Sequence, residues 1–229
     1  MTLILSSLEP FAQGGNRLCF IHPSDKNKVI KVRRPDFSLE EKRRRKGGLK
    51  RLRPLSSFDD NLDEYKVMQS IDKSLGDKAY DCISRCYGFE DTDLGAGLVS
   101  DLVRDEDGHV SHTLKQYIWD NGYTETCQKA VEKFTEDWVI LRIPSTDLLL
   151  HNIVVQLDSQ ANIKCLMVVD GLGESKLIPN WLTPEFILNK KFRRRIKKLE
   201  DRISQLLEER GGDFPGYHGR LLKDSRNEN

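Results

Sequence analysis

The chain has 229 residues, of which 38% are hydrophobic and 32% are charged, and its formal net charge at pH 7 is +1. This length allows one large domain or two small lobes with a buried core. The balanced charge gives the whole molecule no attraction to nucleic acid or lipid, and no stretch approaches the roughly 20 apolar residues of a membrane span. The N-terminus lacks the basic segment and long apolar core of a secretory signal, so we expect a cytoplasmic protein.

The five cysteines are scattered along the sequence rather than grouped. Their odd number favours reduced, partly buried thiols over a disulfide framework. Cys82 and Cys86 are separated by three residues, and His109 and His112 follow, so a zinc site is an alternative. The usual zinc signal is Cys-x-x-Cys, which makes this alternative the weaker one.

Two short strands are predicted near the N-terminus, over residues 17–22 and 28–33, with a polar turn between them. Gly14 and Gly15 stand just before the first strand. A glycine turn lets the backbone approach a ligand and offers N–H groups to phosphate oxygens. Hairpins also use glycine for purely conformational reasons, so this feature alone does not indicate a phosphate site.

Lys31 lies between apolar residues in the second of these strands. Strand alternation places Lys31 on one face with Val29 and Arg33, and Ile30 and Val32 on the other. A lysine in such a run is either exposed at an edge or positioned to pair with an anion. Both interpretations stay open when this strand is considered alone.

The segment 42–53 is rich in Lys and Arg and contains no acidic residue. Such a run is typical of a solvated helix face or of a contact for an acidic partner, and only weakly indicates nucleic-acid binding. A helix is predicted from about Asp59, with apolar residues at three-residue steps. Glu64 lies near its start, where acidic residues favour the positive end of the helix dipole.

Farther along the chain, the pattern predicts a second β-hairpin over residues 82–104, with its turn at 91–97. A helical region follows over residues 113–143, and Asn121-Gly122 divides it into a short and a longer helix. Pro144 ends the longer helix.

A last helix is predicted from Thr183, followed by a first-turn proline and acid, to about Gly211. Its first half, residues 190–198, is strongly basic. We expect this helix to pack on the rest of the protein, with pairing to another helix or contact with an anionic membrane surface as alternatives. The polar tail after Tyr217 is expected to be loose.

The most informative stretch joins Asp147, Asn152 and Asp170. Asp147 precedes Asn152 by five residues, Asn152 enters an apolar run, and a second apolar run ends at Asp170-Gly171. These runs predict a hairpin whose ends meet, so that Asn152 and Asp170 converge on one point. Amide and carboxylate oxygens suit a hydrated magnesium ion, with Asp147 beside it to accept a proton. An ordinary surface hairpin that uses Asp and Asn as turn residues is the alternative.

The order of these features resembles the protein-kinase fold, in which H-R-D-L-x-x-x-N is followed by D-F-G. Asp147-Leu148 and Asn152 match the first pattern, and Asp170 matches the first residue of the second. The strand around Lys31 resembles the V-A-I-K strand. Glu64, followed four residues later by Met68, resembles the helix glutamate that pairs with that lysine.

A closer resemblance is to the bacterial YrbL family, which is named for the PhoP regulatory network and grouped with kinase-like proteins. The matching motifs are Gly-x-Asn-Arg-x-Cys-Phe-x-His-Pro from Gly14, then Ile-Lys-Val, then Leu-Arg-Pro-Leu-Ser-Ser-Phe-Asp-Asp-Asn. The resemblance extends over nearly the whole chain. It implies a bacterial cytoplasmic setting but no particular substrate.

The resemblance implies an α+β, protein-kinase-like fold of two lobes. The first, residues 1–103, is a small antiparallel β lobe with one helix, and the second, residues 104–229, is mainly helical. The implied cofactors are ATP and magnesium. Backbone groups near Asp101 to Val103, in the connection between the lobes, are expected to hold the adenine edge.

The resemblance also implies roles for the other residues. Gly14 and Gly15 would cover the triphosphate, and Lys31, held by Glu64, would bind its α and β oxygens. Asn152 and Asp170 would hold magnesium. Asp147 would orient or deprotonate the acceptor hydroxyl.

Two departures from the kinase pattern affect the expected activity. Ser145 and Thr146 replace the usual His and Arg, which removes a support for the catalytic loop. Only about ten residues separate Gly173 from Thr183, which is short for a loop that docks a peptide. Both departures favour a small-molecule or glycan acceptor, or no phosphoryl transfer.

Three hypotheses follow. The first is an ATP- and magnesium-dependent phosphotransferase acting on a small-molecule, glycan or protein hydroxyl in a PhoP-type regulatory setting. The second is a pseudokinase regulator that binds nucleotide or a protein partner without phosphoryl transfer. The third, which has least support, is a binder of nucleic acid or an anionic surface through residues 42–53 and 190–198.

Overall fold

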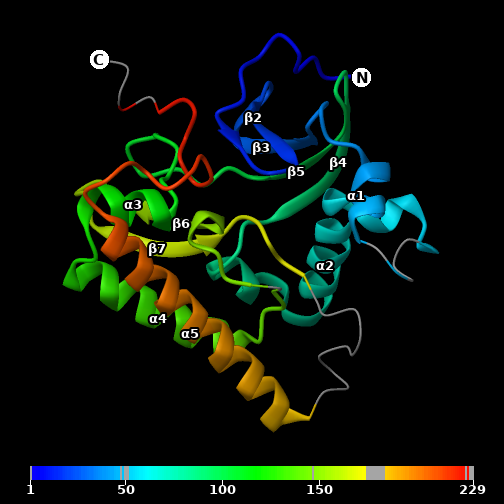
Figure 1. Ribbon diagram of the computed structural model, residues 1–229. Coiled ribbons are helices and arrows are strands. Elements are labelled where there is room, and N and C mark those ends of the chain that lie inside the picture. Colours follow the sequence, from blue (N-terminus) through cyan, green and yellow to red (C-terminus); the bar gives the residue numbers. More distant parts are fainter. Residues whose placement is uncertain are drawn as a thin grey trace.

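The computed structural model describes residues 2–46, 48, 52–145, 147–173, 184–224 and 226. An antiparallel five-stranded sheet with helices beside it forms one lobe, and helices around a two-stranded hairpin form the other (Figure 1). The two-lobed α+β fold is therefore confirmed. The boundary between residues 103 and 104 stays a prediction, and it falls within the irregular connection of residues 102–113.

The sheet of the first lobe has the strand order β1-β2-β3-β5-β4. Its strands are β1 (Ala12–Gln13), β2 (Arg17–His22), β3 (Asp25–Arg33), β4 (Cys86–Thr92) and β5 (Gly95–Asp101). Ile30 and Val32 of β3 are fully buried in an apolar cluster on one side of the sheet. Because side chains alternate along a strand, Lys31 projects from the opposite side, toward α2.

Two helices follow β3, α1 (Leu39–Lys46) and α2 (Asp60–Leu75), with the short 3-10 helices η2 (Leu55–Phe58) and η3 (Gly76–Asp81) on either side of α2. Helix α2 begins where the sequence predicts. The Asp59 carboxylate accepts hydrogen bonds from the amides of Asn61 and Leu62 at 2.9 and 3.3 Å and so caps the helix. This cap fixes the start of the helix that carries Glu64, whose side chain is buried.

The second hairpin is displaced from its predicted position. Its first strand starts at Cys86, and its turn is the two residues between Thr92 and Gly95 rather than residues 91–97. The Thr92 hydroxyl donates to the Gly95 carbonyl at 2.6 Å, and Gly95 has a φ of 100° that favours glycine. Ile83, expected in the strand, is instead buried beside Val168 of the other lobe.

The second lobe contains α3 (Leu114–Asn121), α4 (Glu125–Leu141), η4 (Leu150–Asn152), β6 (Ile153–Leu157), β7 (Ile163–Val168) and α5 (Glu185–Glu209). Thr113 and Thr124 cap α3 and α4 with their side-chain oxygens. Helix α4 stops two residues before its predicted end, because Arg142 adopts a left-handed conformation. Thr183, the predicted cap of the last helix, lies outside the described residues.

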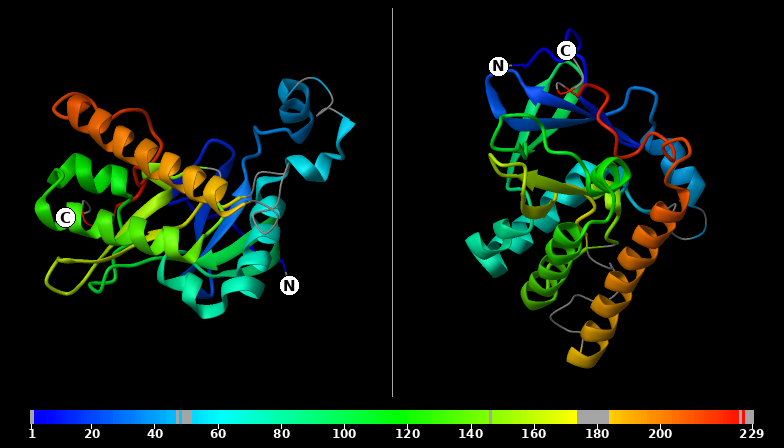
Figure 2. Two further views of the ribbon diagram at one scale, coloured as in Figure 1. Left: turned by 90° about the horizontal axis from the view of Figure 1, so that it is seen from below. Right: turned by 90° about the vertical axis from the view of Figure 1, so that its left-hand side faces the viewer.

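The larger apolar core combines side chains of the second lobe with others from α2 and η3. Helices α4 and α5 run beside one another, and α4 packs on the β6-β7 hairpin (Figures 1 and 2). Trp138 of α4 and Phe192 of α5 are its largest fully buried side chains, and Met68 and Ile71 of α2 belong to the same cluster. No helix among the described residues is long and apolar enough to cross a membrane.

The tail after α5 is docked rather than loose, contrary to the sequence-based expectation. Residues 214–224 return past α3 to the first lobe, as the red trace in Figure 1 shows. The Leu222 amide donates to the Phe11 carbonyl at 2.8 Å. The His112 Nε2 lies 2.6 Å from a carboxylate oxygen of Asp224 in the second lobe. These contacts with distant parts of the chain explain how a polar segment gains a fixed path.

Candidate functional site

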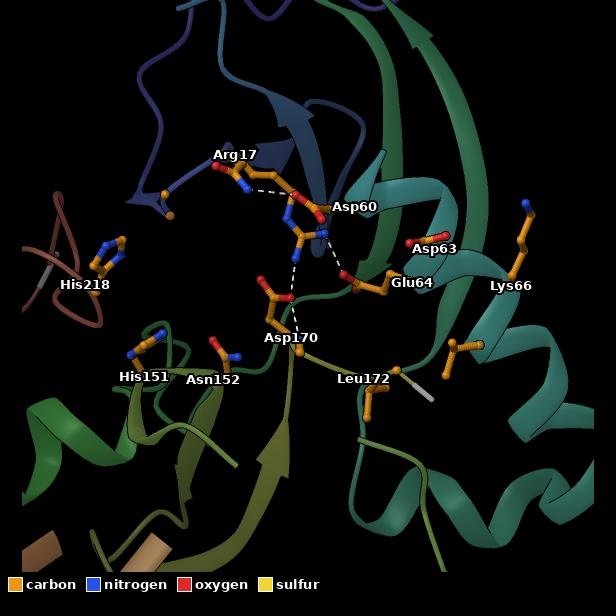
Figure 3. Close-up of a pocket in the computed structure, with 16 residues that line it drawn as sticks. Arg17, Asp60, Asp63, Glu64, Lys66, His151, Asn152, Asp170, Leu172 and His218 are labelled. Atoms are coloured by element: carbon orange, nitrogen blue, oxygen red, sulfur yellow. Dashed lines mark hydrogen bonds and ion pairs between the residues drawn. The ribbon is translucent and has the colours of Figure 1, made fainter. Parts of the chain in front are cut away.

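Two adjoining cavities lie between the lobes. The larger cavity has a volume of about 600 Å³ and is drawn in Figure 3. The smaller cavity, of about 140 Å³, reaches under β2 and β3 to the connection between the lobes. Six polar or glycine residues line both cavities: Gly14, Arg17, His151, Asn152, Asp170 and His218. The predicted nucleotide and metal residues therefore face a shared space.

Lys31 and Glu64 form the ion pair that the resemblance implied. The Lys31 Nζ lies 2.7 Å from a Glu64 carboxylate oxygen and 2.6 Å from the Val169 carbonyl oxygen. The two residues are 4% and 7% exposed. Burial disfavours the charged amine, but the charges of Glu64 and Asp170 outweigh it and raise the pKa of Lys31. The lysine is thus a fixed cation beside the cavities.

Arg17 is the site residue that the sequence analysis missed. Its guanidinium lies 2.5 Å from the second oxygen of Glu64 and 2.9 Å from the Asn61 side-chain oxygen. The same guanidinium forms an ion pair with Asp170 (Figure 3). The available signal was strand alternation, because Arg17 shares a face with Cys19, the register partner of Lys31.

Asn152 and Asp170 project into the larger cavity from the two ends of the β6-β7 hairpin (Figure 3). The hairpin closes as predicted, with the Val169 amide donating to the Asn152 carbonyl at 2.9 Å. Gly171 has a φ of 79°, and a β-carbon there would come within 2.4 Å of the Asn152 side-chain nitrogen. Glycine at position 171 therefore leaves the space that the Asn152 side chain occupies beside Asp170.

The Asp170 carboxylate is held in its charged form. Burial opposes ionisation, but the charges of Arg17 and Lys31 outweigh it and lower the pKa of Asp170 to about 2. A carboxylate and an amide oxygen fit magnesium, which prefers oxygen ligands and keeps several waters or phosphate oxygens. The described residues contain no group of three or more His, Cys, Asp or Glu side chains suited to a metal. With one carboxylate and one amide oxygen from the protein, the remaining ligands of a magnesium ion would come from phosphate or water.

The same finding removes geometric support for a zinc site at Cys82, Cys86, His109 and His112, within the described part of the chain. Cys82 is buried against apolar side chains of the larger core. His112 pairs with Asp224 instead of a thiol.

Asp147 is held by a cation from α5. Both carboxylate oxygens accept hydrogen bonds from the Arg202 guanidinium, at 2.6 and 3.1 Å, and the Lys198 amine lies 3.8 Å away. Burial disfavours the charged form, but these cations outweigh it and lower the pKa of Asp147. Arg202 supplies a guanidinium that the sequence around Asp147 lacks. Asp147 is not among the described residues that line either cavity.

The glycine turn borders the larger cavity without needing glycine for its conformation. Neither Gly14 nor Gly15 has a positive φ, and added β-carbons would lie 3.8 Å from Arg17 and 3.7 Å from His218. The Gly14 amide donates to the Arg17 carbonyl at 2.9 Å and is therefore not free for a phosphate. A β-carbon would fit at either position in ordinary van der Waals contact, so glycine is required there neither for conformation nor for space.

The connection between the lobes is partly committed to internal hydrogen bonds. Asp101 and Val103 both line the smaller cavity. The Asp101 amide donates to the Arg85 carbonyl at 2.9 Å, and the Leu102 amide donates to the Asn27 carbonyl at 2.8 Å. These two amides are therefore not available to an adenine edge, and the Val103 carbonyl already accepts the Ser111 amide at 3.1 Å.

The docked tail forms one wall of the site. His218, Gly219, Arg220 and Leu221 line the smaller cavity, and His218 also lines the larger one. The His218 ring stacks on His151, with ring centroids 5.5 Å apart. Local sequence patterns gave no signal for this contact.

The fold and the site together define a class. It is a two-lobed α+β protein whose interlobe cavities carry a buried Lys–Glu pair, with an Asn and an Asp on the facing hairpin. The chain belongs to the YrbL family, since the family model described as PhoP regulatory network protein YrbL matches residues 3–204. The tail that lines the cavities lies beyond the matched residues.

Similar proteins include YrbL of Escherichia coli (strain K12) and YrbL of Shigella flexneri. Each is 29% identical over 181 residues, which cover 76% of this chain and 75% of the relative. Among solved structures, the crystal structure of Rad53 1-466 in complex with AMP-PNP is similar at 13% identity and a TM-score of 0.44, covering 90% of this chain and 48% of that one. This chain thus spans about half the length of that structure.

Proposed function

We propose that the interlobe cavities bind ATP with magnesium and that the protein transfers a phosphoryl group to a hydroxyl. The observation that carries this proposal is the Lys31–Glu64 pair, at 2.7 Å, in which Lys31 lines the smaller cavity and Glu64 the larger. Asn152 and Asp170 line both of these cavities. Phosphoryl transfer depends chiefly on positioning and on neutralising phosphate charge, which these residues can supply. The PhoP-type regulatory setting is part of the same proposal.

The residues would divide the work as follows. Lys31 would bind phosphate oxygens while Glu64 fixes its position, and Asn152 and Asp170 would hold the magnesium ion, which neutralises charge on the transferring group when bound. Asp147 would orient the acceptor hydroxyl. Because Arg202 already binds both of its oxygens, Asp147 would act mainly by positioning and only weakly as a base.

Binding is tested first, by thermal unfolding with ATP and magnesium. A ligand at 100 times its Kd stabilises a protein by about 2.7 kcal/mol, which raises the melting temperature by about 5–10 °C for a chain of this size. Wild type should show this shift and Lys31→Met should lose it. Lys28→Met, on the same strand, should keep it, because Lys28 pairs with Asp25 outside the cavities. A wild-type protein without a magnesium-dependent shift would contradict the proposal.

One observation favours a regulator that binds nucleotide without transferring phosphate. Both carboxylates required for catalysis are ion-paired, Asp170 with Arg17 and Asp147 with Arg202. ATP hydrolysis or autophosphorylation separates the two functions. A catalyst should lose its signal in Asp147→Ala and Asp170→Ala, whereas equal signals from wild type and both variants would leave only the regulator.

A further inference from the structure

Arg17 lies between Glu64 and Asp170, two of the four carboxylates that line the larger cavity. One guanidinium nitrogen binds Glu64 and Asn61. The other binds Asp170, and the contacts with Glu64 and Asp170 are drawn in Figure 3. Arg17 is only 9% exposed, yet it lines both cavities. Its two arms therefore have separate partners, one on helix α2 and one on the hairpin of the second lobe.

The charges of this network balance without a ligand. Two cations, Lys31 and Arg17, face two anions, Glu64 and Asp170. A divalent cation arriving alone at Asp170 would displace a guanidinium arm and leave a buried positive charge without its partner, which is costly. A polyphosphate arriving together with the cation offers that arm new oxygen acceptors, and guanidinium groups bind phosphate well.

We propose that Arg17 is a phosphate-binding residue that gives up Asp170 to the metal in exchange for a phosphate oxygen. The arm on Glu64 and Asn61 stays in place, so the exchange needs a new partner for one nitrogen only. Metal and nucleotide then bind cooperatively, because each removes an obstacle to the other. This inference rests on the proposed function and adds a residue and a binding order to it.

The inference makes opposite predictions for the two ligands. Removing the guanidinium frees Asp170, so Arg17→Met should bind magnesium alone more tightly than wild type does. The same change removes a phosphate contact, so Arg17→Met should bind ATP in the presence of magnesium more weakly. Couplings between sites are typically about 5- to 150-fold, and we expect changes of roughly tenfold in each direction.

The experiment is isothermal titration calorimetry with magnesium chloride alone and with ATP at saturating magnesium. Arg34→Met is the matched control, because Arg34 pairs with the exposed Asp36 and lines neither cavity. Arg17→Lys serves as a second variant should Arg17→Met fail to fold. It keeps the charge but lacks the two-armed fork, so it should show the same two changes with smaller size.

The outcomes separate this inference from the function on which it rests. Opposite changes for the two ligands support a phosphate-binding Arg17. Parallel losses of both affinities, or no change in either, in a folded variant would mean that Arg17 only stabilises the lobes, and the inference would be wrong while ATP binding stands. A wild-type protein that binds neither ligand would overturn both.

Discussion

At the residue scale, the site depends on a few buried charges that stabilise one another. Glu64 is the centre of this group, because one of its oxygens binds Lys31 and the other binds Arg17. A buried charge is tolerated only when it is paired and hydrogen-bonded. The energetic effect of a substitution should therefore follow the number of partners left behind.

We expect Glu64→Gln to destabilise the protein more than Lys31→Met. Losing the shared carboxylate leaves two buried cations short of an anion, which should lower the free energy of unfolding by about 3–5 kcal/mol. Losing Lys31 leaves Glu64 still paired with Arg17, so the free energy of unfolding should fall by only about 1–3 kcal/mol. Urea unfolding measures both, and Glu125→Gln in the exposed pair with Lys129 should change little. The reverse order would contradict a central role of Glu64.

Asp170 should make stability sensitive to acid. Its pKa in the folded protein is about 2, below the ordinary 3.8, so its ion pairs stabilise the fold fully above about pH 4 and are lost as the pH falls toward 2. Urea unfolding of wild type and Asp170→Asn at several pH values measures this contribution. The stability lost between pH 5 and pH 2.5 should be smaller in the variant, and equal losses would exclude Asp170 as a source.

At the element scale, α5 combines a packing face with cations aimed at the site. Phe192 is buried in the larger core, and the buried Arg195 guanidinium lies over its ring, 5.5 Å from the centroid. Lys198 and Arg202, farther along the helix, contact Asp147. The basic run is therefore only partly a solvent-facing surface.

Packing of α5 predicts a contrast between two phenylalanines of the same helix. Phe192→Ala should destabilise the protein by about 3–5 kcal/mol, because it leaves a cavity in the core. Phe186 is 73% exposed, so Phe186→Ala should change the free energy of unfolding by less than about 0.5 kcal/mol. Comparable losses in urea unfolding would show that α5 is not anchored by its apolar face.

The exposed cations of α5 keep the third hypothesis open to test. Arg193, Arg194 and Lys197 face solvent. If this helix contacts a phosphate polymer or an anionic surface, binding to heparin or anionic vesicles should fall steeply with salt. Alanine at all three positions should then abolish retention, while the matched loss of Lys129, Lys133 and Lys164 should not. Equal retention of both variants would exclude α5 as the contact.

At the scale of the whole molecule, the tail joins the two lobes beside the cavities. The Leu222 amide of the tail donates to the Phe11 carbonyl in the first lobe, and Asp224 of the tail contacts His112 in the second. Cys19 lies behind it on the wall of the smaller cavity, and burial raises the pKa of that thiol. Cys19 is half-buried, and opening of the tail should expose it further.

Removing the residues after Asp213 should speed the labelling of Cys19 by a thiol reagent, located by mass spectrometry. A loss of about 1.4 kcal/mol of protection corresponds to roughly tenfold faster labelling. Cys127, fully buried in the larger core, should stay slow in both proteins and so reports global unfolding. Unchanged labelling of Cys19 would show that the tail does not close the cavity.

The sequence predicted what depends on neighbouring residues. Helix α2 starts after Asp59 because that residue caps it, and the β6-β7 hairpin closes between Asn152 and Asp170 because two apolar runs flank a polar turn. The Lys31–Glu64 pair joins separate elements, and only the family resemblance gave it in advance. The displaced turn of the second hairpin shows the limit of prediction from local sequence. Several polar residues there could form the turn, and the Thr92 hydroxyl bonds across the one that does.

The sequence by itself thus determined the order of the elements, and the family resemblance supplied the two-lobed class and the residues proposed for ATP and magnesium. Tertiary structure alone decided that Arg17 binds Asp170, that Arg202 binds Asp147, and that the tail lines the cavities. The physical reason is that the residues next to a long charged side chain in the sequence do not determine its ion-pair partner. Its partner is fixed only when packing brings distant segments together, where an unpaired charge is costly.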